Sequence, residues 1–329
     1  MKIAVVFNPS AGRKRIFSEI GKDLNEKLKE QNVITGEAGY GKNYIDSEKI
    51  IALSGTSFLE KLEYLMKNFI AENPDIIIGV GGDGILTHIA SILLKRNVRI
   101  PLMGIAGGTA NVGPLIRFNA SNLLKMNFEN LSIEEIPALK VNIPGKSSLY
   151  AFNDIVIGDT FLGTQNGNMV NLSVKDFLEF KMKIVKEPQT NLFGKNFTIK
   201  KNKTKVAGLF LPVQIVLSPL YARKFYIGKA VSGSLCLADY FDEGAAICLS
   251  DTILIDSNLR KTPAPILSQH ILFGKNDLIE FENLSEDLYF ILDGNPTVKA
   301  SENVSIEYIE NAIDSVIFDK NDILPILEY

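Results

Sequence analysis

Residues 75–84, with the sequence DIIIGVGGDG, decide the fold class of this chain. Residues 75–80 are a nearly continuous apolar run, which predicts a strand buried on both faces. Glycines follow at once, and residues 87–95 have the pattern of a helix. A strand, a glycine-rich turn and a helix in this order are typical of a parallel α/β sheet.

The flanking sequence repeats this alternation. Residues 2–7 predict a buried strand, apolar residues recur at helical spacing over 17–28 and 59–69, and residues 100–105 predict a further strand. We therefore expect an α/β domain with an open parallel sheet over residues 1–139. Residues 36–43 nearly match a P-loop, but Asn43 replaces the hydroxyl residue that would bind Mg²⁺, so a flexible surface loop is the better interpretation.

From about residue 140 the pattern changes to short β-type segments separated by turn residues. These segments are residues 139–143, 149–157, 170–174, 197–199, 213–217 and 246–249. They predict a mostly β second domain over residues 140–309. The aromatic residues Phe177, Phe180 and Tyr226 are interpreted as core residues of this domain.

Composition limits the classes of function. The chain has 329 residues, 46% of them hydrophobic and 22% charged, as in an ordinary globular protein. A net charge of −3 gives no global basis for nucleic-acid binding. The apolar run at the N-terminus is too short for a signal peptide, and no stretch approaches the ~20 apolar residues of a membrane span. With only Cys236 and Cys248, both expected to be buried, we predict a cytoplasmic protein without stable membrane insertion.

Residues 79–84 also match the GxGxxG pattern of a dinucleotide-binding turn. That site needs an acidic residue ~20 positions further on, and residues 103–108 (MGIAGG) contain none. Asp83 would in addition repel a pyrophosphate. A carboxylate in a glycine turn instead suits chemistry in which it holds Mg²⁺ or deprotonates an attacking hydroxyl. A helix-capping role for Asp83 stays open.

Two more turns accompany residues 81–84 (GGDG): residues 107–111 (GGTAN) and residues 8–12 (NPSAG). Together the three turns resemble those of the NAD kinase and diacylglycerol kinase superfamily, in which the first two line the ATP phosphate site. The resemblance implies a kinase that uses ATP and Mg²⁺, with Asp83 as the catalytic residue. The residues that it implies for nucleotide binding are Asn8, Gly81, Gly82, Gly84, Gly107, Gly108, Thr109 and Asn111.

The NAD kinase branch of the superfamily is favoured by residues 151–157 (AFNDIVI), which are similar to the strand whose polar pair binds the dinucleotide. Residues 131–139 and 288–318 are also similar to segments of that branch. The resemblance thus implies NAD as the acceptor, NADP as the product, and Asn153 and Asp154 as substrate-binding residues. It also implies that the α/β domain over residues 1–139 binds the nucleotide and is completed by residues 310–329, that the β-rich domain over residues 140–309 binds the substrate, and that the chain forms a homo-oligomer.

The sequence departs from the NAD kinase pattern at three places. Ile85 replaces a threonine, Asp154 replaces a glutamate, and no segment similar to TPTGSTAY is present, although residues 217–223 and 232–234 are comparable. Two alternatives therefore stay open: a kinase for diacylglycerol or another small polyol, and a non-catalytic nucleotide-binding regulator. No exposed apolar or polybasic stretch for membrane docking is evident, which counts against a lipid acceptor. Arg117 could pair with a phosphate or with a surface carboxylate, and His88 is interpreted as an ordinary helix residue.

Overall fold

The chain folds into two compact units, each with its own hydrophobic core. Unit 1 contains Met1–Ile136 and the segment that begins at Asn311, and unit 2 contains Pro137–Glu310. The computed structural model describes residues 1–11, 14–108, 111, 113–128, 131–165, 168–206, 210–219, 244–258, 265–300 and 304–318.

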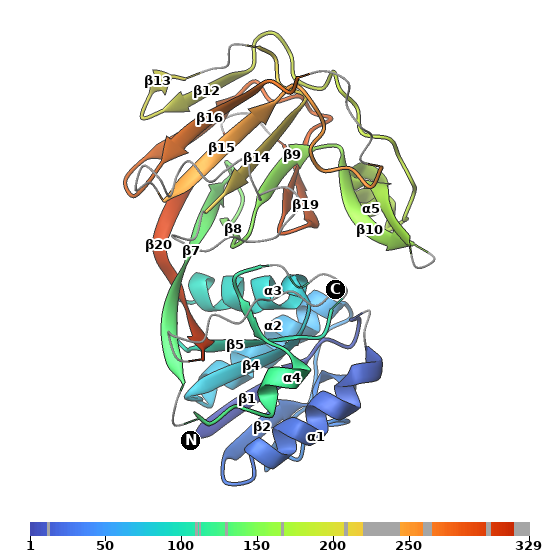
Figure 1. Cartoon of the computed structure of the whole chain (residues 1–329), viewed down its shortest axis with the longest axis vertical. Helices are drawn as coiled ribbons and strands as arrows, with labels where there is room; N and C mark the ends of the chain where they lie inside the picture. Colours follow the sequence, from blue (N-terminus) through green and yellow to red (C-terminus); the bar gives the residue numbers. More distant parts are fainter. Residues whose placement is uncertain are drawn as a thin grey trace. The chain divides into compact units, whose positions relative to one another are not determined.

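A parallel sheet forms the centre of unit 1 (Figure 1). Its strands are β1 (Lys2–Phe7), β2 (Asn32–Gly36), β3 (Lys49–Ile51), β4 (Ile76–Gly81) and β5 (Leu102–Ala106). Their order is β3-β2-β1-β4-β5, and β6 (Ile116–Phe118) pairs in parallel with β5. From β1 the chain continues to β2 and β3 on one side, whereas β4 and β5 lie on the other side of β1. The loops that follow β1 and β4 therefore lead away in opposite directions. In an open α/β sheet, ligands bind beside such a switch point, at the carboxyl ends of the strands.

Helices cover both faces of this sheet. They are α1 (Phe17–Lys27), α2 (Phe58–Ala71), α3 (Asp83–Lys95) and the short α4 (Ala120–Leu123), with 3-10 turns at Lys14–Ile16 and Ala38–Tyr40. Alternate residues of β1 point to opposite faces, and Val5 and Phe7 pack with Phe17 and Ile20 of α1 in one core cluster. Figure 1 shows α2 and α3 together on the other face. The α/β fold expected for the N-terminal part is confirmed.

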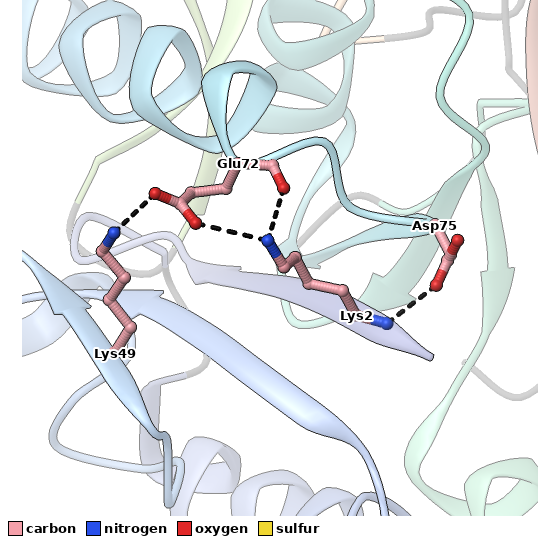
Figure 2. Close-up of polar contacts among 4 residues, drawn as sticks. All are labelled: Lys2, Lys49, Glu72 and Asp75. Atoms are coloured by element: carbon pink, nitrogen blue, oxygen red, sulfur yellow. Dashed lines mark hydrogen bonds and ion pairs between the residues drawn. The ribbon is translucent and has the colours of Figure 1, made fainter.

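Charged residues tie together the amino-terminal edge of the sheet in unit 1 (Figure 2). The Lys2 ammonium donates to the carbonyl of Glu72 at 2.7 Å and lies 3.3 Å from its carboxylate, which also accepts from Lys49 at 2.5 Å. The backbone amide of Lys2 donates to Asp75 at 2.7 Å. These contacts join β1, β3 and the turn before β4, and the lysine hydrogen bonds lower the pKa of Glu72. This network lies at the end of the sheet opposite the glycine turns.

Unit 2 is mostly β, as expected, and contains antiparallel sheets (Figure 1). One sheet has the order β16-β15-β14-β9-β18-β19, and a second sequence of paired strands runs β13-β12-β17-β20. The strands are β7 (Ser132–Asn142), β8 (Leu149–Ala151), β9 (Ile155–Gly158), β10 (Thr160–Gln165), β11 (Asn168–Ser173), β12 (Thr198–Lys201), β13 (Thr204–Lys205), β14 (Gln214–Ser218), β15 (Ala245–Ser250), β16 (Ser268–Phe273), β17 (Leu278–Glu282), β18 (Tyr289–Leu292), β19 (Asn295–Lys299) and β20 (Val304–Ile317). Residues of β7 and β20 belong to both units.

The core of unit 2 packs apolar residues of these strands, among them Ile157, Ile215 and Phe290. A separate hairpin, β10 with β11, leads into the helix α5 (Val174–Phe180). The single β segment expected over residues 149–157 is in fact two strands, β8 and β9, because residues 152–154 form a turn. Cys248 is fully buried in β15, as expected, whereas Cys236 lies outside the described residues. Among the described residues, no helix is long and apolar enough to cross a membrane.

Candidate active site

The candidate site in unit 1 lies at the carboxyl ends of β1, β4 and β5. In the sheet register, Phe7 is opposite Val80 and Gly81 is opposite Ala106, so the turns after the three strands begin at the same edge. The amide of Asn8 continues the pairing by donating to the carbonyl of Val80 at 2.9 Å. The fold therefore gathers three turns that are separated by up to about a hundred residues in sequence.

The two glycine turns touch through their backbones. The amide of Gly107 donates to the carbonyl of Gly81 at 2.7 Å. A Cβ atom added to Gly108 would lie 2.5 Å from the Cα of Gly82 and 2.9 Å from its nitrogen. A Cβ on Gly107 would lie 3.2 Å from the nitrogen of Gly81. Glycine is therefore required at Gly108 by the close approach of another backbone, which no side-chain rearrangement could relieve.

Asp83 joins these two turns. It occupies the first position of α3, and the preceding N-cap residue is Gly82, which has no side chain to cap the helix. The Oδ1 atom of Asp83 accepts a hydrogen bond from the amide of Gly113 at 2.9 Å. One carboxylate oxygen is thus committed to the chain that follows the second glycine turn. Asp83 is positioned by tertiary structure and does not occupy the N-cap position.

Two asparagines shape the neighbouring loops. The side chain of Asn111 accepts from the amide of Gly108 at 3.1 Å and donates to the carbonyl of the same residue at 3.0 Å. The side chain of Asn8 accepts from the amide of Ser10 at 2.9 Å, which fixes the turn after β1. A Cβ on Gly81 would lie 2.9 Å from the Cβ of Asn8, so these two turns are also in contact. Both asparagines hold backbone in place, a role that the sequence pattern alone did not predict.

The arrangement fits a phosphate group with a bound cation. The amino terminus of the 13-residue helix α3 has no side-chain cap, and its amides and partial positive charge favour an anion there. Mg²⁺ bound to a nucleotide commonly takes only one or two protein carboxylates and completes its shell with phosphates and water. Asp83 can supply one such ligand. Among the described residues, no group of three or more His, Cys, Asp or Glu side chains could hold a metal ion by itself.

Ile85 replaces the threonine that the resemblance leads us to expect, and the structure shows what it does. Its side chain is 1% exposed. Its Cγ2 atom lies 2.7 Å from the position that a Cβ on Gly81 would take. Ile85 therefore packs beneath the first glycine turn as a core residue, and supports that turn by apolar contact.

Two other polar residues near this edge have structural surroundings. Arg117 pairs with the carboxylate of Glu134 at 2.7 Å, so the interpretation of Arg117 as a partner of a carboxylate agrees with the structure. His88 is half-buried in α3, and burial, with a smaller contribution from Lys95, lowers its pKa. A lowered pKa keeps the imidazole neutral near pH 7.

In unit 2, Asn153 and Asp154 lie in the buried turn between β8 and β9. The carboxylate of Asp293 accepts hydrogen bonds from the amides of Phe152 at 3.0 Å, Asn153 at 2.7 Å and Asp154 at 3.0 Å. The amide of Asp293 in turn donates to the carbonyl of Asp154 at 2.9 Å. Within the pair, the Asn153 side chain donates to Asp154 Oδ2 at 2.8 Å. The polar pair is therefore held rigidly in a position that is 8–9% exposed.

Asp293 is the organising residue of this turn, and it was not among the expected site residues. It forms a two-residue hairpin turn with Gly294 between β18 and β19, and both residues have positive φ, 49° and 73°. Ser218, at the end of β14, adds a hydrogen bond from its hydroxyl to the carbonyl of Asn153 at 2.7 Å. A two-residue Asp-Gly hairpin is readable from sequence, but its contact with a turn about 140 residues earlier is not.

One expected site residue and most of the comparable substrate segment cannot be placed. Thr109 lies outside the described residues, as do residues 220–223 and 232–234 of the comparable substrate segment. Gly84 is the second residue of α3.

The near-match to a P-loop at residues 36–43 is a compact turn, in which the amide of Lys42 donates to the carbonyl of Gly36 at 2.9 Å and Tyr40 is buried. The segment lies at the surface, as expected, since Ala38, Lys42 and Asn43 are exposed, while its flexibility stays a prediction.

The chain is similar to known proteins in three comparisons, by family model, by sequence and by fold. Residues 2–115 match the diacylglycerol kinase catalytic domain. An uncharacterized protein from Archaeoglobus fulgidus is 25% identical over 318 residues, which are 93% of this chain and 95% of that protein.

Among solved structures, a putative diacylglycerol kinase from Bacillus anthracis covers 97% of this chain and 98% of its own, with a TM-score of 0.56 and 15% identity. The match to yeast NADH kinase in complex with NADH covers 100% of this chain and 90% of the yeast protein, with a TM-score of 0.52 and 12% identity. The fold is similar to those of a diacylglycerol kinase and an NADH kinase, and the resemblance seen in the sequence is confirmed at the level of the fold.

Proposed function

We propose that this chain is a phosphotransferase that moves a phosphoryl group from ATP, bound with Mg²⁺, to a hydroxyl group of a small acceptor. The observation that carries the proposal is the position of Asp83. Its carboxylate lies at the junction of two glycine turns that touch through their backbones, and at the uncapped start of a helix. Anion-binding amides and one fixed carboxylate are the parts that phosphoryl transfer needs.

The residues of unit 1 have separate tasks in this proposal. The glycine turns (Gly81, Gly82, Gly84, Gly107 and Gly108) let the backbone approach the phosphates closely, and Thr109 adds a hydroxyl to the second turn. Asn8 and Asn111 keep the turns in shape through their hydrogen bonds to backbone. Asp83 holds the cation or takes the proton of the attacking hydroxyl. When bound, Mg²⁺ would neutralise charge on the transferred group.

NAD is the acceptor that we favour, with NADP as the product. Asn153 and Asp154 form a rigid, nearly buried polar pair of the kind that can recognise a polar ligand with little loss of side-chain freedom. The similarity to a yeast NADH kinase supports this choice. The substitution of aspartate for glutamate shortens the second member of the pair by one methylene.

A lipid such as diacylglycerol is the second candidate for the acceptor. The match of residues 2–115 to the diacylglycerol kinase catalytic domain favours it. A non-catalytic regulator on the same scaffold is a weaker alternative, because the burial of Ile85 accounts for the missing threonine by packing without implying that the phosphate site is lost.

The first test is ATP consumption by the purified chain with Mg²⁺, with NAD, NADH or diacylglycerol micelles as acceptors and polyphosphate as an alternative donor. Asp83→Asn is the key variant. Asp75→Asn is its matched control, because Asp75 precedes β4 and lies at the opposite edge of the same sheet. We expect NADP formation by the wild type and by Asp75→Asn, and its loss in Asp83→Asn.

Turnover of diacylglycerol alone would replace NAD by a lipid acceptor. Equal activity of the Asp83→Asn and Asp75→Asn variants would refute the role of Asp83. Binding of Mg²⁺-ATP without phosphorylation of any acceptor would favour the regulator.

A further inference from the structure

Residues 180–185 expose an unusual number of apolar side chains. Phe180 is 61% exposed, Met182 51%, Ile184 41% and Val185 57%. The expectation that Phe180 belongs to the core is therefore wrong, whereas Phe177, one turn earlier in α5, packs against Phe161 with a ring-centroid distance of 5.2 Å. Single exposed apolar residues are common, but four within six positions mark an interaction surface.

The backbone of this segment is fixed, although its side chains are exposed. Helix α5 ends at Phe180, and its C-cap residue, Lys181, has a left-handed conformation with φ of 58°. The chain then runs antiparallel to β11: the carbonyl of Ile184 accepts from the amide of Ser173 at 2.8 Å, and the amide of Lys186 donates to the carbonyl of Asn171 at 3.0 Å. Figure 1 shows α5 beside the β10–β11 hairpin. The segment thus presents its side chains from a preformed edge.

Lysines alternate with the apolar residues. The sequence of residues 180–186 is FKMKIVK, which contains three lysines and no acidic residue. Lys181 and Lys183 are exposed, while Lys186 forms an ion pair with Asp159 at 2.8 Å. Met169 of β11, 52% exposed, adds an apolar side chain on the strand with which this segment pairs. Glu179 and Glu187 flank the segment, so its positive charge is confined to its centre.

We propose that residues 180–186, with Met169, form a docking surface for an anionic lipid membrane. Apolar side chains would enter the boundary between headgroups and acyl chains, while the lysine stems lie along apolar surface and keep their ammonium groups among anionic headgroups. A second protein chain fits this composition less well, because the cores of protein interfaces are depleted in lysine. The surface is peripheral and involves no membrane-spanning segment.

This inference does not depend on the proposed phosphoryl transfer. It does bear on the acceptor, because the absence of a docking stretch in the sequence was one of two arguments against a lipid, beside the Asn153–Asp154 pair. The structure contains such a stretch in residues 180–186. It was not evident in the sequence, because α5 and the strand-like segment after it show an ordinary alternation of apolar and charged residues.

The test is sedimentation of the full chain with vesicles of phosphatidylcholine containing phosphatidylserine, compared with phosphatidylcholine alone, without nucleotide. Lys181→Gln combined with Lys183→Gln should lower the partition coefficient about 25-fold, since each lysine near an anionic surface contributes roughly fivefold. Phe180→Ser combined with Ile184→Ser should lower it about tenfold or more.

Matched controls should leave the partition unchanged: Leu59→Ser, a 50% exposed side chain in α2, and Lys22→Gln combined with Lys29→Gln, which are exposed on and after α1. Circular dichroism would verify that all variants fold. No binding by the wild type, equal binding to both kinds of vesicle, or equal loss in variants and controls would overturn the proposal. Sedimentation velocity tests the alternative that a second copy of the chain binds this surface. A wild-type dimer that is abolished by Phe180→Ser would assign the surface to self-association and overturn membrane docking.

Discussion

The contact between the two glycine turns leads to a sharp prediction for Gly108→Ala. The added methyl group would lie 2.5 Å from the Cα and 2.9 Å from the nitrogen of Gly82. Both atoms belong to backbone, so the turns have to separate by roughly 1 Å to restore ordinary van der Waals contact. Overpacking of this kind typically costs about 1–3 kcal/mol.

The consequence for nucleotide binding should exceed the consequence for stability. Separation of the turns would displace the amide of Gly107, which donates to the carbonyl of Gly81 at 2.7 Å, and with it the loop whose Gly113 amide holds Asp83. A displacement of about 1 Å at a catalytic constellation can reduce the rate on the order of a hundredfold. We expect Gly108→Ala to lower Tm by about 2–4 °C for each kcal/mol lost and to weaken Mg²⁺-ATP binding strongly.

Gly194→Ala is the matched control, because a Cβ at Gly194 would meet no atom within 4 Å. Thermal unfolding and calorimetric titration with Mg²⁺-ATP measure the two effects. If Gly108→Ala matched Gly194→Ala in both Tm and affinity, the two turns could not be in backbone contact, and the geometry argued for the phosphate site would be refuted.

Three further changes test other parts of the structure. The carboxylate of Asp293 accepts hydrogen bonds from the amides of Phe152, Asn153 and Asp154, so Asp293→Asn should lower the free energy of unfolding in urea by at least about 2 kcal/mol. Asp287→Asn, at an exposed position, is the control and should have no measurable effect. Equal urea midpoints of the two variants would contradict the role of Asp293. Ile85→Thr should lower the free energy of unfolding by about 2 kcal/mol without raising turnover, because the side chain is 1% exposed and the new hydroxyl would be buried beneath Gly81. Ile85→Val is the milder comparison. A gain in turnover would show that the site lacks a hydroxyl there. The pKa of His88 is lowered in the folded chain, so the unfolded chain binds a proton at His88 more readily. The contribution of neutral His88 to stability is therefore full above the unfolded pKa of about 6.5 and is lost as pH falls toward the folded pKa. The urea midpoint of His88→Gln should fall less between pH 8 and pH 5 than that of the wild type, and parallel profiles would exclude His88 as the titrating group.

The fold of unit 1 and its candidate phosphate site could be predicted because their signals are local. A buried strand, a glycine turn and a helix start are contiguous in residues 75–95, and the strand over residues 2–7 has the same form. The helix predicted from residue 87 begins at Asp83, because a glycine turn that leads directly into a helix leaves no apolar periodicity in its first residues. Strand order and the meeting of the turns then follow from the rules of open parallel sheets.

The details of unit 2 could not be predicted in the same way. The break between β8 and β9 depends on the carboxylate of Asp293, which is 139 to 141 residues away in sequence from the amides that it binds. The exposure of Phe180 depends on where α5 ends and on which side of β11 the next residues pair. Neither contact leaves a pattern in the neighbouring residues.

The sequence by itself determined that this protein has a parallel α/β unit with a carboxylate inside a glycine turn, followed by a mostly β unit. It could do so because apolar periodicity and glycine turns act over a few residues. Only the tertiary structure decided that two glycine turns touch, that Asp83 is held by Gly113, and that Ile85 lies beneath the first turn. These are contacts between backbones and side chains brought together by strand pairing, and close packing determines them only once the whole sheet has formed.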